Sequence, residues 1–208
     1  MAMVDNFIYP ATGSHTLTKA GEKMANYLTL IHECKDFSAW KKAYDADAPR
    51  RTAAGLTEIH VLREHDNANL VALMFGVSDV GRANAFATSP DLADVMKSAG
   101  VIGTPKIRFR HGDYARTSAA NYATMTLIVH DYETSLKAYA MDAADRKGAS
   151  LTDLGVLQMN DDPNNLLIVW AVGDVVRATA FFNSAALAAH MVKNAGVIGP
   201  PERHFWKA

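Results

Sequence analysis

The stretch AGVIGTP at residues 99–105 returns as AGVIGPP at residues 195–201. A shift of about 95 residues also aligns matching residues along nearly the whole chain. The matches include Asn26 with Asn121, Asp79 with Asp174, Arg82 with Arg177, Phe86 with Phe181, Ser89 with Ser184, Leu92 with Leu187 and Met96 with Met191. Alanine-rich composition cannot produce the AGVIG match, and chance does not keep one register this long. The chain is therefore interpreted as two copies of one unit of roughly 90 residues.

Each copy follows the same order of expected elements. Asp36 and Asp131 are suited to cap a first helix, Asp79 and Asp174 a second, and Gly100 and Gly196 to end it. In the first copy Ser89-Pro90 interrupts the second helix, with serine as a new cap. Turn-forming residues separate the middle strands. The expected strands lie at residues 28–34, 56–63 and 70–77, at 123–129, 151–158 and 166–172, and after Pro105 and Pro201.

The order strand, helix, strand, strand, helix, strand predicts an α+β fold of two ferredoxin-like βαββαβ repeats. The strands are apolar on both faces, so each sheet needs cover on both sides. The obvious cover is the other copy, which predicts an intrachain pseudo-dimeric α+β barrel with its helices outside. The expected division is an N-terminal arm (1–25), repeat 1 (26–112), a linker (113–121) and repeat 2 (122–208). The arm is expected either to cover a barrel opening or to lack order.

Composition limits the possible partners. The formal net charge is −1 and the pI is about 6.7, so no single-sign field favours nucleic acid or an anionic membrane. The longest apolar runs, such as Leu166 to Val172, are far shorter than a membrane span. Cys34 is the only cysteine, which excludes an internal disulfide, and no Cys/His zinc spacing exists. The N-terminus has no secretory signal pattern, so a cytoplasmic location is expected.

Three segments resemble a known family: KDFSAW (35–40), LTEIHVLREHDNANLV (56–71) and RANAFATSPDLADVMKSAGVIGTP (82–105). They look like the dimeric α+β barrel superfamily, in particular small bacterial proteins related to antibiotic-biosynthesis monooxygenases and often labelled cyclase-like. The resemblance covers residues 27–111 and, more weakly, 122–207. It implies a pocket between sheet and helices and a small hydrophobic, even phenolic or lactone, substrate. The Asn/Trp/His constellation of the haem-degrading branch has no assignable counterpart, so no cofactor is expected.

Polar residues within the expected strands are the candidates for chemistry. His32 lies on the first strand, and Glu58 and His60, two residues apart, are expected on one face of the second. Lys106, Arg108 and Arg110 share a face of the last strand. The second copy has Leu127 in place of His32, Gly155 in place of His60 and His204 in place of Arg108. We therefore expect the first copy to hold the site, with His32 or His60 as general base and Arg108 stabilising an oxyanion.

A structural interpretation competes with each candidate. A strand histidine is more often solvent-facing or hydrogen-bonded within its sheet, and a Lys/Arg row is more often a solvated face. Aromatic residues at these spacings, Trp40, Tyr44, Tyr139 and Trp170, are more often core than pocket lining. Surface or core roles are expected for His130, His190 and His204, and an inert buried thiol for Cys34.

Three functional hypotheses remain open at this level. The first is a cofactor-independent enzyme, monooxygenase-like or isomerase/cyclase-like, with acid–base chemistry from His32 and His60. The second is a non-catalytic or stress-associated binder of a small hydrophobic molecule, which predicts a pocket without convergent polar groups. The third is an interaction module with a filled barrel. Either a monomeric pseudo-dimer or a homodimer fits the repeat.

Overall fold

The computed structural model describes residues 25–208, so the predicted arm (1–25) lies outside the described residues apart from Ala25. The first half of the described chain forms four strands and four helices in the order β1 (Asn26–Cys34), α1 (Phe37–Ala46), α2 (Ala48–Ala53), β2 (Leu56–Glu64), β3 (Leu70–Val77), α3 (Val80–Ala87), α4 (Pro90–Ser98) and β4 (Val101–His111).

The second half repeats this order. Its elements are β5 (Asn121–Val129), α5 (Tyr132–Met141), α6 (Ala143–Gly148), β6 (Leu151–Met159), β7 (Asn165–Val172), α7 (Val175–Phe182), α8 (Ala185–Lys193) and β8 (Val197–Lys207). Two βαββαβ units, each with its helices broken in two, therefore follow one another as the sequence repeat predicts.

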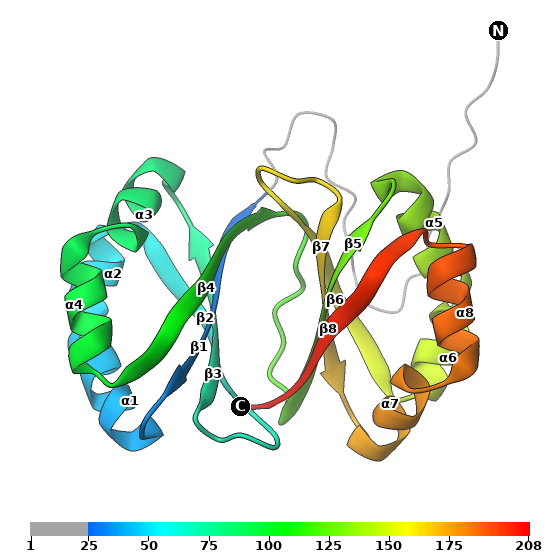
Figure 1. Cartoon of the computed structure of the whole chain (residues 1–208), viewed down its shortest axis with the longest axis horizontal. Helices are drawn as coiled ribbons and strands as arrows, with labels where there is room; N and C mark the ends of the chain where they lie inside the picture. Colours follow the sequence, from blue (N-terminus) through cyan, green and yellow to red (C-terminus); the bar gives the residue numbers. More distant parts are fainter. Residues whose placement is uncertain (1–24) are drawn as a thin grey trace, which may run out of the picture.

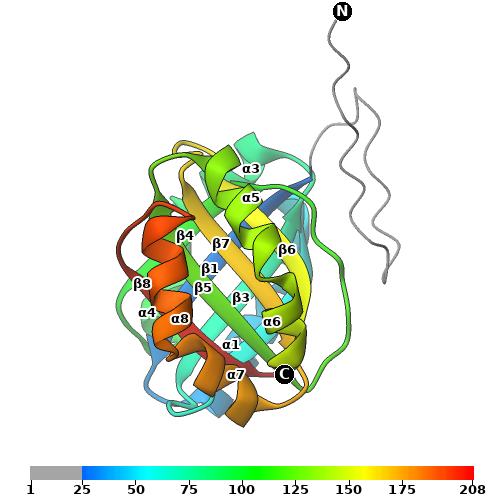
Figure 2. The same ribbon diagram turned by 90° about the vertical axis from the view of Figure 1, so that its right-hand side faces the viewer.

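The eight strands close into one barrel in the order β1-β3-β2-β8-β5-β7-β6-β4. Figure 1 shows the two sheets facing each other, with α1–α4 on one outer side and α5–α8 on the other. Figure 2 looks onto the second half, where the helices lie across β5 to β8. The predicted intrachain pseudo-dimeric α+β barrel is thus confirmed.

The two sheets join through short seams. β2 pairs with β8 only at Arg63–Lys207 and Glu64–Trp206. β4 pairs with β6 only at Arg110–Met159 and His111–Gln158. Because the seams are confined to strand ends, the rest of β4 and β8 has no backbone pairing with the opposite sheet.

Side-chain caps start the helices at the residues that the sequence indicated. Asp36 accepts a hydrogen bond from the backbone N–H of Ala39 at 2.7 Å, and Asp131 accepts one from Thr134 at 2.8 Å. Ser184 caps α8 as Ser89 caps α4, although no proline follows Ser184. The break between the last two helices therefore depends on the serine cap and not on proline.

The first helix of each half is shorter than its apolar spacing suggested. In the sequence, Phe37, Trp40, Tyr44 and Ala48 follow helical spacing, which predicts one helix, but α1 ends at Ala46 and a separate α2 starts at Ala48. The guanidinium of Arg51 donates to the backbone carbonyl of Tyr44 at the end of α1, which also accepts from the backbone N–H of Asp47 at 3.2 Å. The second half breaks at the equivalent point, where Arg146 donates to the carbonyl of Tyr139.

Buried side chains form three clusters: one between each sheet and its own helices, and one between the two sheets. Trp206, fully buried, belongs to the inter-sheet cluster. Within residues 25–208 no single helix is long and apolar enough to cross a membrane, and only the pair α7–α8, bent by 53°, passes that test in combination.

Candidate functional site

A β-bulge in β2 separates two residues that sequence spacing placed together. Glu58 pairs with Phe75 and His60 with Met74, so Ile59 is the extra residue and the alternation of faces shifts there. Glu58 therefore turns to the helices, where it accepts a hydrogen bond from the Tyr44 hydroxyl. His60 turns into the barrel instead. The expectation that Glu58 and His60 share a face is wrong.

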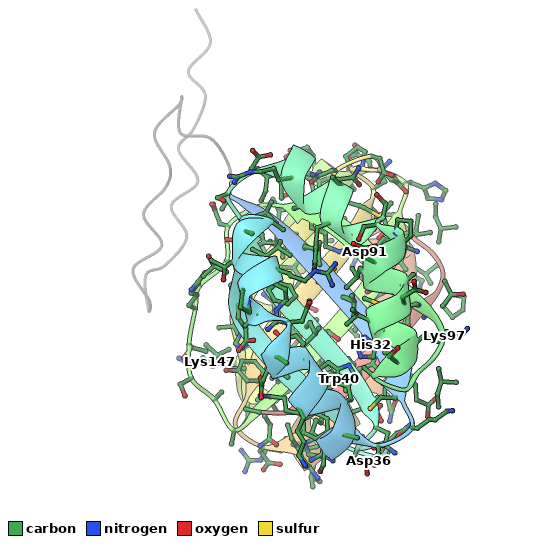
Figure 3. The ribbon with its side chains drawn as sticks, turned by 90° about the vertical axis from the view of Figure 1, so that its left-hand side faces the viewer. His32, Asp36, Trp40, Asp91, Lys97 and Lys147 are labelled. Carbon is green, nitrogen blue, oxygen red and sulfur yellow. The ribbon has the colours of Figure 1, made fainter. Side chains whose placement is uncertain are left out.

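His32 faces the opposite way from His60. It lies on β1 beneath α1, where its ring centroid is 5.2 Å from that of Trp40 (Figure 3). It lines a cavity of about 60 Å³ between the first sheet and its helices. The structure thus places His32 where the family resemblance implied a pocket, but it does not bring His32 and His60 together.

The imidazole of His32 is buried without a partner. The residue is 5% exposed, and neither ring nitrogen has a hydrogen-bond partner within residues 25–208. Burial lowers the pKa of His32 to about 4, so the ring is neutral at pH 7. A buried polar group left unpaired typically costs about 1–3 kcal/mol. His32 is therefore a destabilising residue that packing alone does not explain.

The rest of this pocket is mostly apolar and aromatic. Trp40 stacks on Tyr44 with centroids 4.9 Å apart, and the guanidinium of Arg51 lies 3.6 Å from the centre of the Tyr44 ring. Arg51 also lies 3.9 Å from Asp47. Burial, together with the hydrogen bond to Glu58, raises the pKa of Tyr44 well above its ordinary value. Tyr44 is therefore neutral, and His32 is the unengaged polar group of the pocket.

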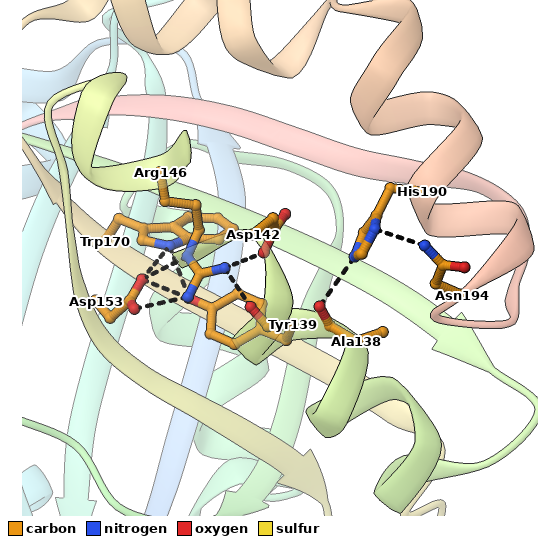
Figure 4. Close-up of polar contacts among 8 residues, drawn as sticks. All are labelled: Ala138, Tyr139, Asp142, Arg146, Asp153, Trp170, His190 and Asn194. Carbon is orange, nitrogen blue, oxygen red and sulfur yellow. Dashed lines mark hydrogen bonds and ion pairs between the residues drawn. The ribbon is translucent and has the colours of Figure 1, made fainter. Parts of the chain in front are cut away.

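Between its sheet and its helices, the second half has a network of hydrogen-bonded polar side chains (Figure 4). Arg146 donates to Asp142 and Asp153, and the Trp170 indole donates to Asp153 at 2.9 Å. The Tyr139 hydroxyl donates to Asp153 at 2.6 Å. The cavity here is about 40 Å³.

Leu127 stands at the position of His32 and lines this smaller cavity. It is 6% exposed, so the position is buried in both halves. Among the described residues, the second half thus has no buried side-chain nitrogen or oxygen without a hydrogen-bond partner, in contrast to the first half.

His60 has partners that account for its position. Its Nε2 lies 2.7 Å from the hydroxyl of Tyr114, and its ring lies 4.7 Å from that of Tyr122. Burial, and secondarily the charge of Arg116, lowers the pKa of His60. At the equivalent position in the second half, a Cβ on Gly155 would lie 2.6 Å from the Asp113 carbonyl oxygen. Residues 113–121 thus cross β6 at Gly155, and His60 is bonded to a tyrosine of the same segment.

Arg108 faces the barrel interior together with Lys106 and Arg110, as their spacing predicted. Arg108 therefore lies on the opposite face of the sheet from the His32 pocket and cannot stabilise an oxyanion there. Arg110 is 3% exposed, so this row is not a simple solvated face.

The other candidates have structural surroundings. Cys34 is 1% exposed with its Sγ 3.3 Å from the Asn69 carbonyl oxygen, and burial raises its pKa, which keeps the thiol protonated. His190 bonds to the Ala138 carbonyl through Nε2 (Figure 4), His204 lies against Glu64 and Glu202, and His130 is exposed. In the part of the chain that the structure describes, no three His, Cys, Asp or Glu side chains gather to hold a metal ion.

Sequence reasoning missed Arg51 and Arg146, which are buried next to the two pockets. A usable signal existed, because arginine occurs at the same position of both repeats. That agreement indicates a shared structural role, whereas the difference between His32 and Leu127 indicates a role confined to one half.

Comparison with known proteins supports the fold alone. No family model matches the sequence, and no curated protein is significantly similar to it. An anthrone oxidase-like protein superimposes with a TM-score of 0.57 at 11% identity, over 89% of this chain and 92% of the other. A variant of chlorite dismutase from Candidatus Nitrospira defluvii gives 0.56 at 9% identity, over 90% and 93%.

A third structure, from Fusobacterium nucleatum and provisionally named a monooxygenase, gives a TM-score of 0.55 at 9% identity, over 88% of this chain and 92% of the other. All three similarities extend over nearly the full length of both chains. The protein therefore has the dimeric α+β barrel fold, with both halves of the barrel supplied by one polypeptide.

Proposed function

We propose that this protein is a cofactor-independent enzyme acting on a small hydrophobic compound, and that His32 is its proton acceptor. One observation carries the proposal: a neutral imidazole, buried and without a hydrogen-bond partner among residues 25–208, lines an apolar cavity in one half, while leucine occupies its place in the other. A stabilising residue was available at this position, so retaining histidine is best explained by chemistry.

The chemistry that fits is removal of a proton from a phenol, enol or activated C–H bond. The proton moves to an unpaired nitrogen of His32, which leaves a substrate anion next to an imidazolium. Their attraction in an apolar pocket offsets the low basicity that burial gives the ring. The anion can then react with dioxygen or take back a proton at another carbon, so oxygenation and isomerisation share this first step. The names of two fold relatives, a monooxygenase and an anthrone oxidase-like protein, favour oxidation but do not select a substrate.

The size of the pocket restricts the substrate. A volume of about 60 Å³ is smaller than the ~150 Å³ of an engineered apolar cavity that holds benzene. Binding of even one aromatic ring therefore requires α1 and α4 to separate from the sheet. We expect monocyclic compounds to be better substrates than polycyclic ones.

Replacing His32 by leucine tests the proposal, because the second half already accommodates leucine there. Turnover of monocyclic phenols and enols, followed by product formation with and without oxygen, should fall about 100-fold, as expected for loss of a general base. The free energy of unfolding of the same variant should be about 1–2 kcal/mol higher than that of the wild type, because the substitution removes an unpaired buried polar group. Chemical denaturation measures this gain.

His60→Gln is the matched control, since it removes an imidazole outside the pocket and should leave turnover unchanged. Undiminished turnover in His32→Leu would remove His32 from the mechanism. Ligands that perturb the His32 imidazole NMR signals without forming product would instead support the non-catalytic binder.

A further inference from the structure

A third cavity lies between the two sheets, separate from the His32 pocket and from its counterpart in the second half. Its volume is about 360 Å³, against about 60 Å³ around His32. Small-molecule sites typically have volumes of ~300–1,000 Å³. Both halves contribute to its walls, and its apolar lining includes Leu62, Met74, Leu167, Val169 and Trp206.

The charges that line this cavity do not balance. Lys106, Arg108 and Arg110 face it from β4, and the carboxylate that lines it is Glu202 of β8. Glu202 pairs with Lys106 at 2.6 Å. Among residues 25–208 no carboxylate lies within 4 Å of the guanidinium of either arginine, so two positive charges remain without a counter-charge.

Arg110 is the deeper of the two cations. It donates from Nη1 to the Asn165 carbonyl at 3.1 Å and from Nη2 to the Asn165 side chain at 3.3 Å. Its Nε is buried and has no partner in the described part of the chain. Burial, with the charge of Arg108, lowers the pKa of Arg110 to about 10, so it stays charged at pH 7. The hydrogen bonds from Arg110 to Asn165 link the two halves, but a neutral side chain could also donate them.

The opposite wall carries no arginine in the described lining, because the copies differ at these positions. Arg108 pairs with Thr29 of β1, and His204 pairs with Thr124 of β5, so His204 is the equivalent of Arg108 in the second repeat. By the same register, Trp206 is the equivalent of Arg110. The two arginines therefore lie on the β4 side of the cavity, and the indole of Trp206 lies on the β8 side. An amphipathic molecule would match both walls.

We propose that the barrel interior binds a small organic carboxylate with an apolar body, its carboxylate on Arg108 and Arg110. Guanidinium groups bind planar oxyanions with paired, charge-assisted hydrogen bonds. Residues two apart on a strand share a face, so both arginines can reach one ligand. The body packs on the apolar lining near Trp206. Lys106 and Arg108 line the cavity and are exposed, which gives the ligand a way in.

Isothermal titration with 2-naphthoate and its neutral analogue 2-naphthamide tests the proposal. The carboxylate should bind the full-length protein at least about ten-fold more tightly than the amide. Arg108→Gln and Arg110→Gln should each weaken the carboxylate about ten-fold and leave the amide unchanged. Arg82→Gln, which removes an exposed arginine on α3, is the matched control.

A variant that narrows the cavity without changing its charge completes the design. Ala72 lines the cavity where the second repeat has Leu167. Ala72→Leu should therefore fold and should weaken both compounds equally. If Arg110→Gln does not fold, Arg108→Gln decides, because its guanidinium is exposed and forms no ion pair with a residue in the described chain.

Equal affinity for carboxylate and amide, no measurable binding of 2-naphthoate at millimolar concentration, or unchanged affinity in Arg108→Gln would overturn the proposal. His32→Leu should bind 2-naphthoate normally, so this test and that of the proposed enzyme fail or succeed separately. Loss of binding in His32→Leu would place the naphthoate in the other pocket and would also overturn the inference.

Discussion

Replacing Arg146 by methionine is expected to lower the free energy of unfolding by about 3 kcal/mol, because it removes one partner of a buried ion-pair network. Arg146 is 3% exposed and holds Asp142, Asp153 and the carbonyl that ends α5. Its hydrogen bonds help to keep the pKa of Asp153 below its ordinary value, although burial of that carboxyl acts in the opposite direction. Without the guanidinium, Asp142 and the Tyr139 carbonyl lose this donor, and Asp153 keeps only the Tyr139 hydroxyl and the Trp170 indole.

The magnitude depends on how well the orphaned carboxylates can be hydrated. Breaking a buried pair usually costs ~3–5 kcal/mol. The Asp142 side chain is 13% exposed, but that of Asp153 is 45% exposed, so water can replace part of what Asp153 loses. This places the expectation at the lower end of the range.

Urea denaturation at pH 7 measures the loss for Arg146→Met. The control is Arg177→Met, whose pair with Asp174 has side chains 68% and 42% exposed and should contribute less than about 0.5 kcal/mol. Equal effects of the two substitutions would show that the network around Arg146 adds nothing beyond a surface pair.

The second large effect is a loss of stability in acid that depends on His32. Its pKa is about 4 in the folded protein and about 6.5 when unfolded, so the unfolded chain takes up a proton first as the pH falls. The free energy of unfolding is therefore unaffected by this titration above pH 6.5 and decreases progressively as the pH falls to 4. Linkage gives a loss of about 3 kcal/mol over this range.

Comparison of the wild type with His32→Leu isolates this contribution. The variant should show a smaller decrease in unfolding free energy between pH 7 and pH 4, by about 3 kcal/mol. His60→Gln serves as the control for a second buried imidazole, whose pKa is also lowered. Parallel pH profiles for the wild type and His32→Leu would mean that His32 is solvated or paired in solution.

The repeat carried enough information to predict the barrel. The duplicated AGVIG segment fixed the equivalence of the halves, and the capping aspartates fixed where helices begin. The bulge at Ile59 could not be predicted, because it depends on how β2 pairs with β3 and leaves no mark in residue spacing. That single extra residue turns His60 into the barrel, whereas His32 faces the helices, so these two candidates do not share a site.

The candidate site was only partly predictable for the same kind of reason. The contrast between His32 and Leu127 is visible in the sequence and coincides with an unpaired buried imidazole in the first half. Whether an imidazole finds a partner depends on the residues that pack around it, and that depends on the tertiary structure. The cavity between the sheets is likewise set by differences in volume, such as Ala72 against Leu167, summed over two facing walls.

The ion pair between Lys106 and Glu202 has a consequence for how such barrels can assemble. β1 pairs Ile31 with Lys106 and β5 pairs Thr126 with Glu202, so the two charges occupy equivalent positions of the repeats. In an isologous homodimer each such position meets its own copy, and lysine would face lysine. Fusing the halves into one gene product removes that constraint and permits opposite charges across the approximate two-fold axis. The same pair disfavours exchange of like halves between molecules, because either half matched with itself would bring equal charges together.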